Sequence, residues 1–339
     1  MKNNNGTIAL QKTDTRLIDS HMRRINYLRI SITDRCNLRC IYCVPGQPIS
    51  RIPHKSILSY EEILKIVRIG TRLGITKVRV TGGEPLVRKD CIDFISRLTQ
   101  INGLKDISLT TNGLLLSRYL EPLADAGISR VNISLDTLYP EKYKAITGID
   151  GFDRVWKAIH KAIDMGFSPV KINVVAMRGV NDDEINDLAG LSRDYPLHVR
   201  FIELMPFGKA QTGIAAPMLE DEILGAITQS GGLTPISRNK FDGPAKKFKF
   251  NDSPGEIGII SPVSHHFCKT CNRLRLTADG RIRMCLLSDE SLDIRAPLRS
   301  GTGDNELAET ILHAVAKKPF IRCLGVQNPP CRTMSAIGG

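Results

Sequence analysis

Short apolar, β-branched runs alternate with longer amphipathic segments through the first two thirds of the chain. Segment 60–74, YEEILKIVRIGTRLG, has apolar residues at three- and four-residue spacing and ends at Gly74, which predicts a helix. Strands that alternate with helices are typical of parallel βαβ units. The six predicted strands are 26–32, 77–81, 106–111, 130–136, 170–176 and 198–204. Because no Gly-x-Gly-x-x-Gly fingerprint accompanies them, the pattern favours an α/β fold of the incomplete (β/α)6 TIM-like barrel type over a dinucleotide-binding sheet.

The pattern changes after Met205. A loop and one short helix near Asp221 precede residues 233–260, which are interrupted by Pro and Gly and show little periodicity. Residues 272–286, NRLRLTADGRIRMCL, then form two alternating runs around Asp279–Gly280, which predicts a hairpin. We therefore expect a flexible tail at 1–20, a barrel at 21–232 and a smaller C-terminal domain at 233–339.

Composition narrows the class of protein. The 339 residues are 42% apolar and 24% charged, an ordinary globular mixture, with no apolar run of membrane-spanning length and no signal-peptide pattern at the polar N-terminus. We expect a soluble cytoplasmic protein that does not bind a membrane. The net charge of +12 favours an acidic partner, although a merely basic surface is the alternative. Since only 5% of residues are aromatic, a phosphate-rich small molecule fits as well as nucleic acid.

Three of the nine cysteines lie within eight residues, directly after the first predicted strand. Disulfides are disfavoured in the cytoplasm, so clustered cysteines are expected to be ligands or catalysts. A [4Fe–4S] cluster presents four irons, and three thiolates leave one iron open for an exogenous ligand. A zinc site completed by a distant histidine, or a redox thiol group, are the alternatives. We call these residues the first cysteine set: Cys36, Cys40 and Cys43.

A second cysteine set comprises Cys268, Cys271 and Cys285. If the hairpin folds at Asp279–Gly280, Cys285 lies opposite Leu274 and returns to the other two. This set again has three thiolates and one open position, and a zinc site with His265 or His266 is the alternative. The remaining cysteines, Cys91, Cys323 and Cys331, are expected to be packing residues.

Polar residues follow the predicted strands. The second strand ends in Gly82, Gly83 and Glu84, and paired glycines let a backbone approach a ligand closely. In a barrel, residues at the carboxyl ends of strands line the active face. A polar mouth is therefore predicted from Thr110, Thr111, Asn112, Ser134, Asp136 and Glu203.

Cationic residues recur on the predicted strands. Arg273 and Arg275 lie at i and i+2, so they share a face beside the second cysteine set. Guanidinium groups suit triphosphate or carboxylate recognition. Arg29, Arg79 and Lys171, on three other strands, could also point into the barrel, which predicts an anion site.

The Cys-x3-Cys-x2-Cys loop, with Tyr42 before its last cysteine, resembles that of the radical S-adenosylmethionine (SAM) superfamily, and GGEP is similar to its motif for the SAM amino group. From about residue 18 to 339 the chain resembles the GTP 3′,8-cyclase family of molybdenum cofactor biosynthesis. The segments that carry this resemblance are LRISITDRCNLRCIYC, VRVTGGEPLVRKD, TTNGLLL, NISLDTL, KINVVAMRGVND, RFIELMPFG, FCKTCNRLRLTADGRIRMCL and MSAIGG.

The resemblance implies a site for each ligand. The first cysteine set would hold the [4Fe–4S] cluster that binds SAM, and the second set would hold a second [4Fe–4S] cluster. SAM would contact Tyr42, Gly83, Ser134 and Met205. GTP would contact Arg29, Arg79, Thr110, Lys171, Arg273, Leu274 and Arg275, of which Arg273 and Arg275 are the expected catalytic residues. The Gly338–Gly339 tail would reach into the active site.

The implied reaction is a radical SAM lyase reaction. A 5′-deoxyadenosyl radical abstracts the ribose 3′ hydrogen of GTP, and the product is (8S)-3′,8-cyclo-7,8-dihydroguanosine 5′-triphosphate. The expected partners are GTP, an external electron donor, the next enzyme of the pathway, which receives the product, and possibly a second copy in a homodimer, but no nucleic acid. Two alternatives stay open: a two-cluster radical SAM enzyme with another substrate, and a zinc-bearing nucleic-acid-binding module.

Overall fold

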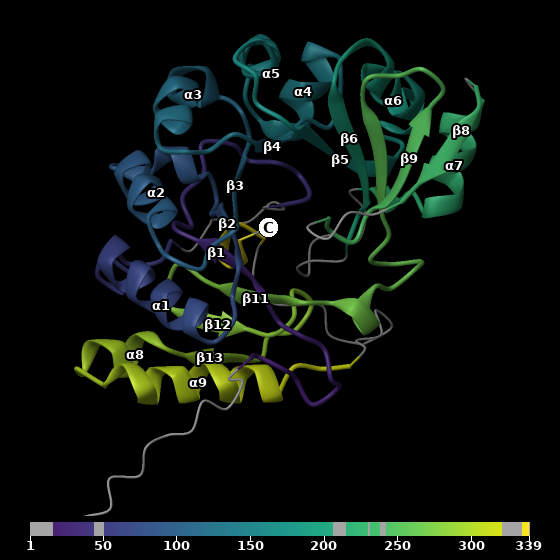
Figure 1. The fold of residues 1–339 in the computed structure, drawn as a ribbon. Helices are drawn as coiled ribbons and strands as arrows, with labels where there is room; N and C mark the ends of the chain where they lie inside the picture. Colours follow the sequence, from purple (N-terminus) through teal and green to yellow (C-terminus); the bar gives the residue numbers. More distant parts are fainter. Residues whose placement is uncertain are drawn as a thin grey trace, which may run out of the picture.

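The computed structural model describes residues 16–43, 51–205, 215–229, 231–237, 242–320 and 334–338. Within them, a 13-stranded sheet curves into an open barrel whose helices cover its outer side (Figure 1). Six consecutive parallel strands form its centre: β1 (Tyr27–Ser31), β2 (Lys77–Thr81), β3 (Asp106–Thr111), β4 (Val131–Ser134), β5 (Val170–Arg178) and β6 (Leu197–Glu203). The predicted incomplete barrel and all six predicted strands are confirmed.

The connecting helices bury one apolar face each. In α1, the Ser59 side chain accepts from the Glu62 N–H while Glu62 accepts from the Ser59 N–H, a capping box that fixes the helix start. The apolar positions 63, 64, 66, 67 and 69 of α1 are buried, as the predicted periodicity requires. The helices of this part are α1 (Tyr60–Arg72), α2 (Cys91–Thr99), α3 (Leu116–Asp125), α4 (Pro140–Thr147), α5 (Phe152–Asp164) and α6 (Ile185–Asp194).

Strands from the C-terminal part extend both edges of the same sheet. β10 (Glu256–Ile260) pairs parallel with β6, followed by β9 (Lys246–Phe250) and β8 (Leu233–Ile236). At the other edge, β11 (Arg273–Leu276) pairs parallel with β1, followed by β12 (Arg281–Arg283) and β13 (Ser291–Asp293). The remaining elements are β7 (Ala216–Pro217), α7 (Glu220–Thr228), α8 (Arg295–Arg299), α9 (Asp304–Ala316) and α10 (Met334–Ile337). The residues after 232 therefore share their main-chain hydrogen bonding with the barrel.

The hairpin β11–β12 has a different register from the one predicted. Arg275 pairs with Arg283 and Leu276 with Ile282, so the register extended beyond the ladder places Cys285 opposite Arg273, one residue from the predicted Leu274. The reason is a three-residue loop rather than a two-residue turn: the Thr277 N–H donates to the Arg281 carbonyl, and Gly280 adopts φ 76°.

The N-terminal segment is docked on the core from Leu17 onward. Leu17 is fully buried, and its N–H donates to the Leu73 carbonyl while its carbonyl accepts from the Ile25 N–H. Residues 16–20 of the predicted tail are thus ordered by apolar burial, and residues 1–15 lie outside the described part. Cys91 is buried in the core as predicted, whereas Cys323 and Cys331 lie outside the described residues. No helix in the described part of the chain is long and apolar enough to cross a membrane.

Candidate active site

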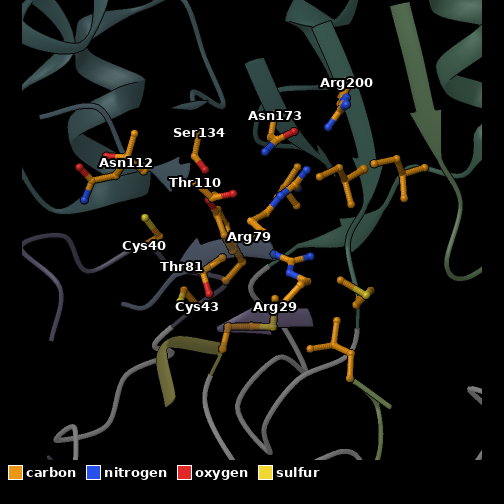
Figure 2. Close-up of a pocket in the computed structure, with 18 of the residues that line it drawn as sticks. Arg29, Cys40, Cys43, Arg79, Thr81, Thr110, Asn112, Ser134, Asn173 and Arg200 are labelled. Carbon is orange, nitrogen blue, oxygen red and sulfur yellow. The ribbon is translucent and has the colours of Figure 1, made fainter. Parts of the chain in front are cut away.

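The barrel interior encloses a cavity of about 280 Å³. The first cysteine set lines it together with Tyr42, Gly83, Ser134, Met205, Arg29, Arg79, Thr110, Arg273 and Arg275, all predicted site residues. In Figure 2, Cys40 and Cys43 lie at one side of this cavity and Arg200 at the other, with Arg29 and Arg79 between them. Residues from β1 to β6 and from β11 therefore converge on one space.

The first cysteine set lies on the loop that follows β1. The Leu38 N–H is 3.4 Å from Cys36 Sγ, and the Asn112 side-chain amide is 3.7 Å from the same sulfur. Burial raises the pKa of Cys36, and burial together with the neighbouring Cys43 thiol raises that of Cys40. Three cysteine thiols on one loop, with N–H donors aimed at the Cys36 sulfur, are a donor set that fits a cysteine-ligated iron–sulfur cluster. Among the described residues, no three His, Cys, Asp or Glu side chains are placed to hold a single metal ion.

Gly82 and Gly83 are closely approached by the protein's own backbone, the segment from Thr33 to Arg35, where a ligand was expected. A Cβ on Gly83 would lie 2.3 Å from the Arg35 carbonyl oxygen, and one on Gly82 would lie 2.8 Å from the Thr33 carbonyl oxygen. The Gly83 N–H donates to Thr33 O at 2.6 Å, and the Glu84 N–H donates to Arg35 O at 2.7 Å. The glycine pair thus seats the cysteine loop against the end of β2.

Glu84 joins the ends of β2 and β3 beneath this loop. Its carboxylate accepts from the Thr111 hydroxyl at 2.8 Å and from the Asn112 N–H at 2.7 Å. Burial raises the pKa of Glu84 to about 7 despite these donors. The side chain of Asn112 in turn donates to Asn37 Oδ1 at 2.8 Å, so the TTN segment fixes the cysteine loop from the β3 side.

Tyr42 is held by a buried carboxylate. Its hydroxyl donates to Asp136 Oδ2 at 2.7 Å, and Asp136 Oδ1 accepts from the Val175 N–H at 2.8 Å. Burial raises the pKa of Asp136 to about 6. Asp136 therefore links the cysteine loop to β5.

Glu203 was predicted to line the polar mouth, and this prediction is wrong. Glu203 is fully buried, but its carboxylate accepts from the N–H groups of Val263, Ser264 and Glu220 and from the Ser264 hydroxyl. With both oxygens engaged by the protein, Glu203 anchors the loop before the second cysteine set and does not line the mouth.

Arg273 and Arg275 both face the cavity, as the alternation of β11 predicts. Leu274, between them, is buried in the hydrophobic core, so only its backbone is available on the cavity side. Burial, then the charge of Arg273, lowers the pKa of Arg275 to about 10, and burial with the charge of Arg275 lowers that of Arg29. The Thr110 hydroxyl is buried and has no hydrogen-bond partner among the described residues.

The C-terminal α10 and Gly338 reach the ends of β1 and β2, in the interior of the barrel (Figure 1). Arg275 Nη1 donates to the Gly338 carbonyl. A Cβ on Gly338 would lie 2.8 Å from Thr81 Oγ1 and 2.9 Å from Ser31 Cβ, and its φ is 72°. The position therefore demands glycine. Gly339 lies outside the described residues.

A second cavity of about 340 Å³ adjoins the first toward the amino ends of the strands and shares Lys77, Arg79, Arg200 and Gly243 with it. The predicted Lys171 lines this second cavity. The sequence reasoning missed the further cations here: Lys77, Arg130, Arg200 and Lys247. The available signal was spacing, since Lys77 stands at i−2 from Arg79 on one strand and therefore shares its face.

The cations at this end repel one another. Burial, then Arg200 and Arg79, lowers the pKa of Lys171 to about 6. Burial, then Arg79, lowers the pKa of Arg200 to about 9. Asp106 compensates part of this charge through ion pairs with Arg130 and with Lys77, the latter at 2.9 Å. Asp242 and Glu256 also line this cavity and form ion pairs with Lys247, at 3.2 Å and 2.9 Å. Burial is the largest cause of the lowered pKa values, and a polyanion would relieve the repulsion that adds to it.

The second cysteine set flanks β11 and β12. The charges of Cys271 and Cys285 both act on the buried Arg275. Cys271 lines a further cavity of about 170 Å³ together with Tyr27 and Arg273. Three half-buried cysteine thiols are again a donor set of the kind that fits an iron–sulfur cluster. His265, the alternative zinc ligand, instead contacts Ser264 Oγ at 3.1 Å and the Glu220 carboxylate at 3.2 Å.

Comparisons with known proteins agree with this geometry. Residues 30–191 match the model of the Radical SAM superfamily, and residues 197–321 match that of Molybdenum Cofactor Synthesis C. In overall fold the chain is similar to SuiB of Streptococcus suis bound to S-adenosylmethionine, at a TM-score of 0.59 and 16% identity over 86% of this chain and 69% of that one.

The fold and the first cysteine loop define a radical SAM protein, a class that uses an iron–sulfur cluster together with SAM. Two curated relatives, the GTP 3′,8-cyclases of Thermodesulfovibrio yellowstonii and Moorella thermoacetica, are 49% and 48% identical over 95% of this chain and 99% of theirs. The chain belongs to the GTP 3′,8-cyclase family.

Proposed function

We propose that this protein is a GTP 3′,8-cyclase that converts GTP into (8S)-3′,8-cyclo-7,8-dihydroguanosine 5′-triphosphate, the first step of molybdenum cofactor biosynthesis. The observation that carries the proposal is the continuity of two unlike sites. Cysteines line one end of the barrel interior and cations line the other, and the two cavities share Lys77, Arg79 and Arg200. One elongated anionic substrate can therefore span both.

At the cysteine end, the first cysteine set would hold a [4Fe–4S] cluster with one iron open to SAM. Tyr42, Gly83, Ser134 and Met205 line the same cavity and would contact SAM. When bound, the cluster would supply the electron that cleaves SAM into methionine and the 5′-deoxyadenosyl radical, the species that would abstract the 3′ hydrogen of the ribose.

At the cation end, the triphosphate would lie among Lys77, Arg79, Lys171 and Arg200, with Arg130 next to it. Lys171 and Arg200 would gain an anionic ligand there, which offsets the repulsion that, after burial, lowers their pKa values. Because the triphosphate is common to substrate and product, these residues contribute to affinity more than to the chemical step.

The nucleoside would then occupy the space between, beside Arg29, Thr110, Arg273 and Arg275. The unpartnered hydroxyl of Thr110 supports a polar ligand at this position. Arg273 and Arg275 also stand next to the second cysteine set, which we propose holds a second [4Fe–4S] cluster that meets the guanine base. These arginines hold the nucleoside at a fixed distance from the SAM end, and such positioning lowers the barrier for an otherwise bimolecular step.

We further propose three partners: an external one-electron donor that reduces the clusters, a second copy of the chain in a homodimer, and the next enzyme, which receives the product.

The test uses anaerobically reconstituted, dithionite-reduced protein with SAM, in the presence and absence of GTP. Mass spectrometry follows 5′-deoxyadenosine and nucleotides with the mass of GTP but a different retention time. We expect both products together, and 5′-deoxyadenosine in amounts that depend on GTP. If 5′-deoxyadenosine forms without any GTP-derived isomer, the radical SAM assignment stands and the substrate is wrong.

A further inference from the structure

Lys318 follows α9 and is 3% exposed, although it carries a charge. Its ammonium donates to the Arg273 carbonyl at 2.9 Å and to the Met284 carbonyl at 2.6 Å. Arg273 begins β11, two residues after Cys271, and Met284 follows β12 and precedes Cys285. One buried ammonium therefore joins the two arms of the hairpin that carry these cysteines.

These two hydrogen bonds hold the Lys318 ammonium next to the backbone of the second cysteine set. Arg273 is two residues from Cys271, and Met284 is adjacent to Cys285. An ammonium has three N–H donors, and the two carbonyls use two of them. A buried charge is costly without an anionic partner, and thiolates on the neighbouring cysteines would supply one.

Arg23 fixes the segment that carries Lys318. Its guanidinium donates to the carbonyls of Cys268 at 2.6 Å, Pro319 at 2.7 Å and Phe320 at 3.1 Å. Arg23 Nε forms an ion pair with the buried Asp19 at 2.6 Å. The two buried cations thus bind the backbone next to all three cysteines of the second set.

We propose that Lys318 is a positioning residue that sets both the assembly and the reduction potential of the iron–sulfur group on Cys268, Cys271 and Cys285. The inference rests on the proposed function in assigning a cluster to this cysteine set. A cluster held by thiolates carries negative charge, and its potential depends on the net charge around it and on hydrogen bonds to its sulfurs. A fixed ammonium next to the backbone of Cys271 and Cys285 favours the reduced state, so the potential is higher with Lys318 than without it.

The experiment isolates the second cluster in full-length protein whose first cysteine set is replaced by serine. Lys318→Gln removes the charge, Lys318→Arg keeps it, and Lys317→Gln is the matched control because the adjacent Lys317 is exposed. Iron and sulfide per chain and an EPR-monitored redox titration are measured for each. We expect Lys318→Gln to lower the cluster content or to shift the midpoint potential to more negative values, while Lys317→Gln matches the parent and Lys318→Arg lies near it.

Equal cluster content and an equal midpoint potential in Lys318→Gln and Lys317→Gln would overturn the role of Lys318 and leave the proposed function intact. A parent that binds no iron–sulfur cluster would instead overturn the second-cluster assignment itself, and the inference with it. If Lys318→Gln does not fold, Lys318→Met removes the same charge with an apolar side chain suited to a buried position. A negative shift of its midpoint potential relative to Lys318→Arg supports the proposal, and an unchanged potential contradicts it.

Discussion

At the carboxyl ends of the strands, the polar side chains around the cavity are held by other parts of the protein, whereas at the amino ends cationic side chains face one another. Glu84 and Asp136 each accept several donors and hold the cysteine loop in place. Lys171 and Arg200, in contrast, have pKa values depressed by burial and by their cationic neighbours. The difference indicates that the cysteine loop is organised before ligands arrive, while the buried charges of Lys171 and Arg200 would be stabilised by an anionic ligand.

The largest effect is expected from removing a thiolate of the first cysteine set, at Cys40. Cys40→Ser removes one of three thiolates, so we expect loss of the first cluster and no detectable 5′-deoxyadenosine. The iron content per chain should fall to about half that of the unmodified protein. Iron analysis and mass spectrometry measure both. Cys91→Ala is the control, because Cys91 is buried in the core away from the cavity. Retained 5′-deoxyadenosine formation in Cys40→Ser would contradict the assignment of the mouth.

Replacing a cation at the amino ends of the strands should weaken GTP binding without disturbing the cysteine end of the cavity. Arg200→Met or Lys171→Met removes a charged hydrogen-bond donor, which contributes about 1.5–3 kcal/mol, so GTP should bind about 10- to 100-fold more weakly. Equilibrium titration with GTP and with guanosine measures the effect, and guanosine affinity should change little. Lys157→Met, which alters an exposed lysine on α5, serves as the control. Equal losses for GTP and guanosine would show that these cations do not bind the triphosphate.

The affinity for GTP should also depend on pH, because Lys171 changes its protonation when the triphosphate binds. With a pKa of about 6, Lys171 is mostly neutral in the free protein at pH 7.5, and a triphosphate raises that pKa because it favours the ammonium. GTP binding should therefore take up a proton, and its Kd should rise with pH by up to about tenfold per unit between pH 7.5 and 8.5, above the second phosphate pKa of about 6. Calorimetry in buffers of different ionisation enthalpy measures the uptake. The proton uptake should disappear in Lys171→Met, and its persistence there would assign it to another group.

The smallest effect is expected at Gly338. Gly338→Ala forces a Cβ to within 3 Å of Thr81 and Ser31 at a positive φ, so the tail should dock less well and the KM for GTP should rise a few-fold. Gly179→Ala is a matched control, because Gly179 has the same φ of 72° with nothing within 4 Å of its added Cβ. Hydrogen exchange of the C-terminal peptide reports docking directly. Equal exchange in the two variants would mean that the close fit of Gly338 is not needed.

Features that follow from the periodicity and spacing of residues could be predicted from the sequence. The six strands, the cysteine loop after β1 and the shared face of Arg273 and Arg275 follow from alternation and spacing, and all three are observed. The hairpin register was predicted wrongly because a two-residue type I′ turn needs a positive φ at both central residues. Gly280 has one and Asp279 does not, and the DG dipeptide alone does not determine this.

Contacts between distant segments could not be predicted. Glu203 ends a strand like its neighbours, and only the tertiary structure shows that the loop around Ser264 consumes its oxygens. Lys318 looks like one of two surface lysines until α9 places it against β11 and β12. Lys77 and Arg200 were not predicted because the rule used for barrels places functional residues at the carboxyl ends of strands. These two side chains instead line the interior of an open barrel.

If one substrate spans both regions, its triphosphate lies at the amino ends of the strands and its ribose within reach of the first cysteine set. GTP deuterated at C3′ tests this with reduced, cluster-loaded protein and SAM, and mass spectrometry follows the label. We expect deuterium in 5′-deoxyadenosine, and much less product from 3′-deuterated guanosine, which lacks the triphosphate. Unlabelled 5′-deoxyadenosine from deuterated GTP would contradict it.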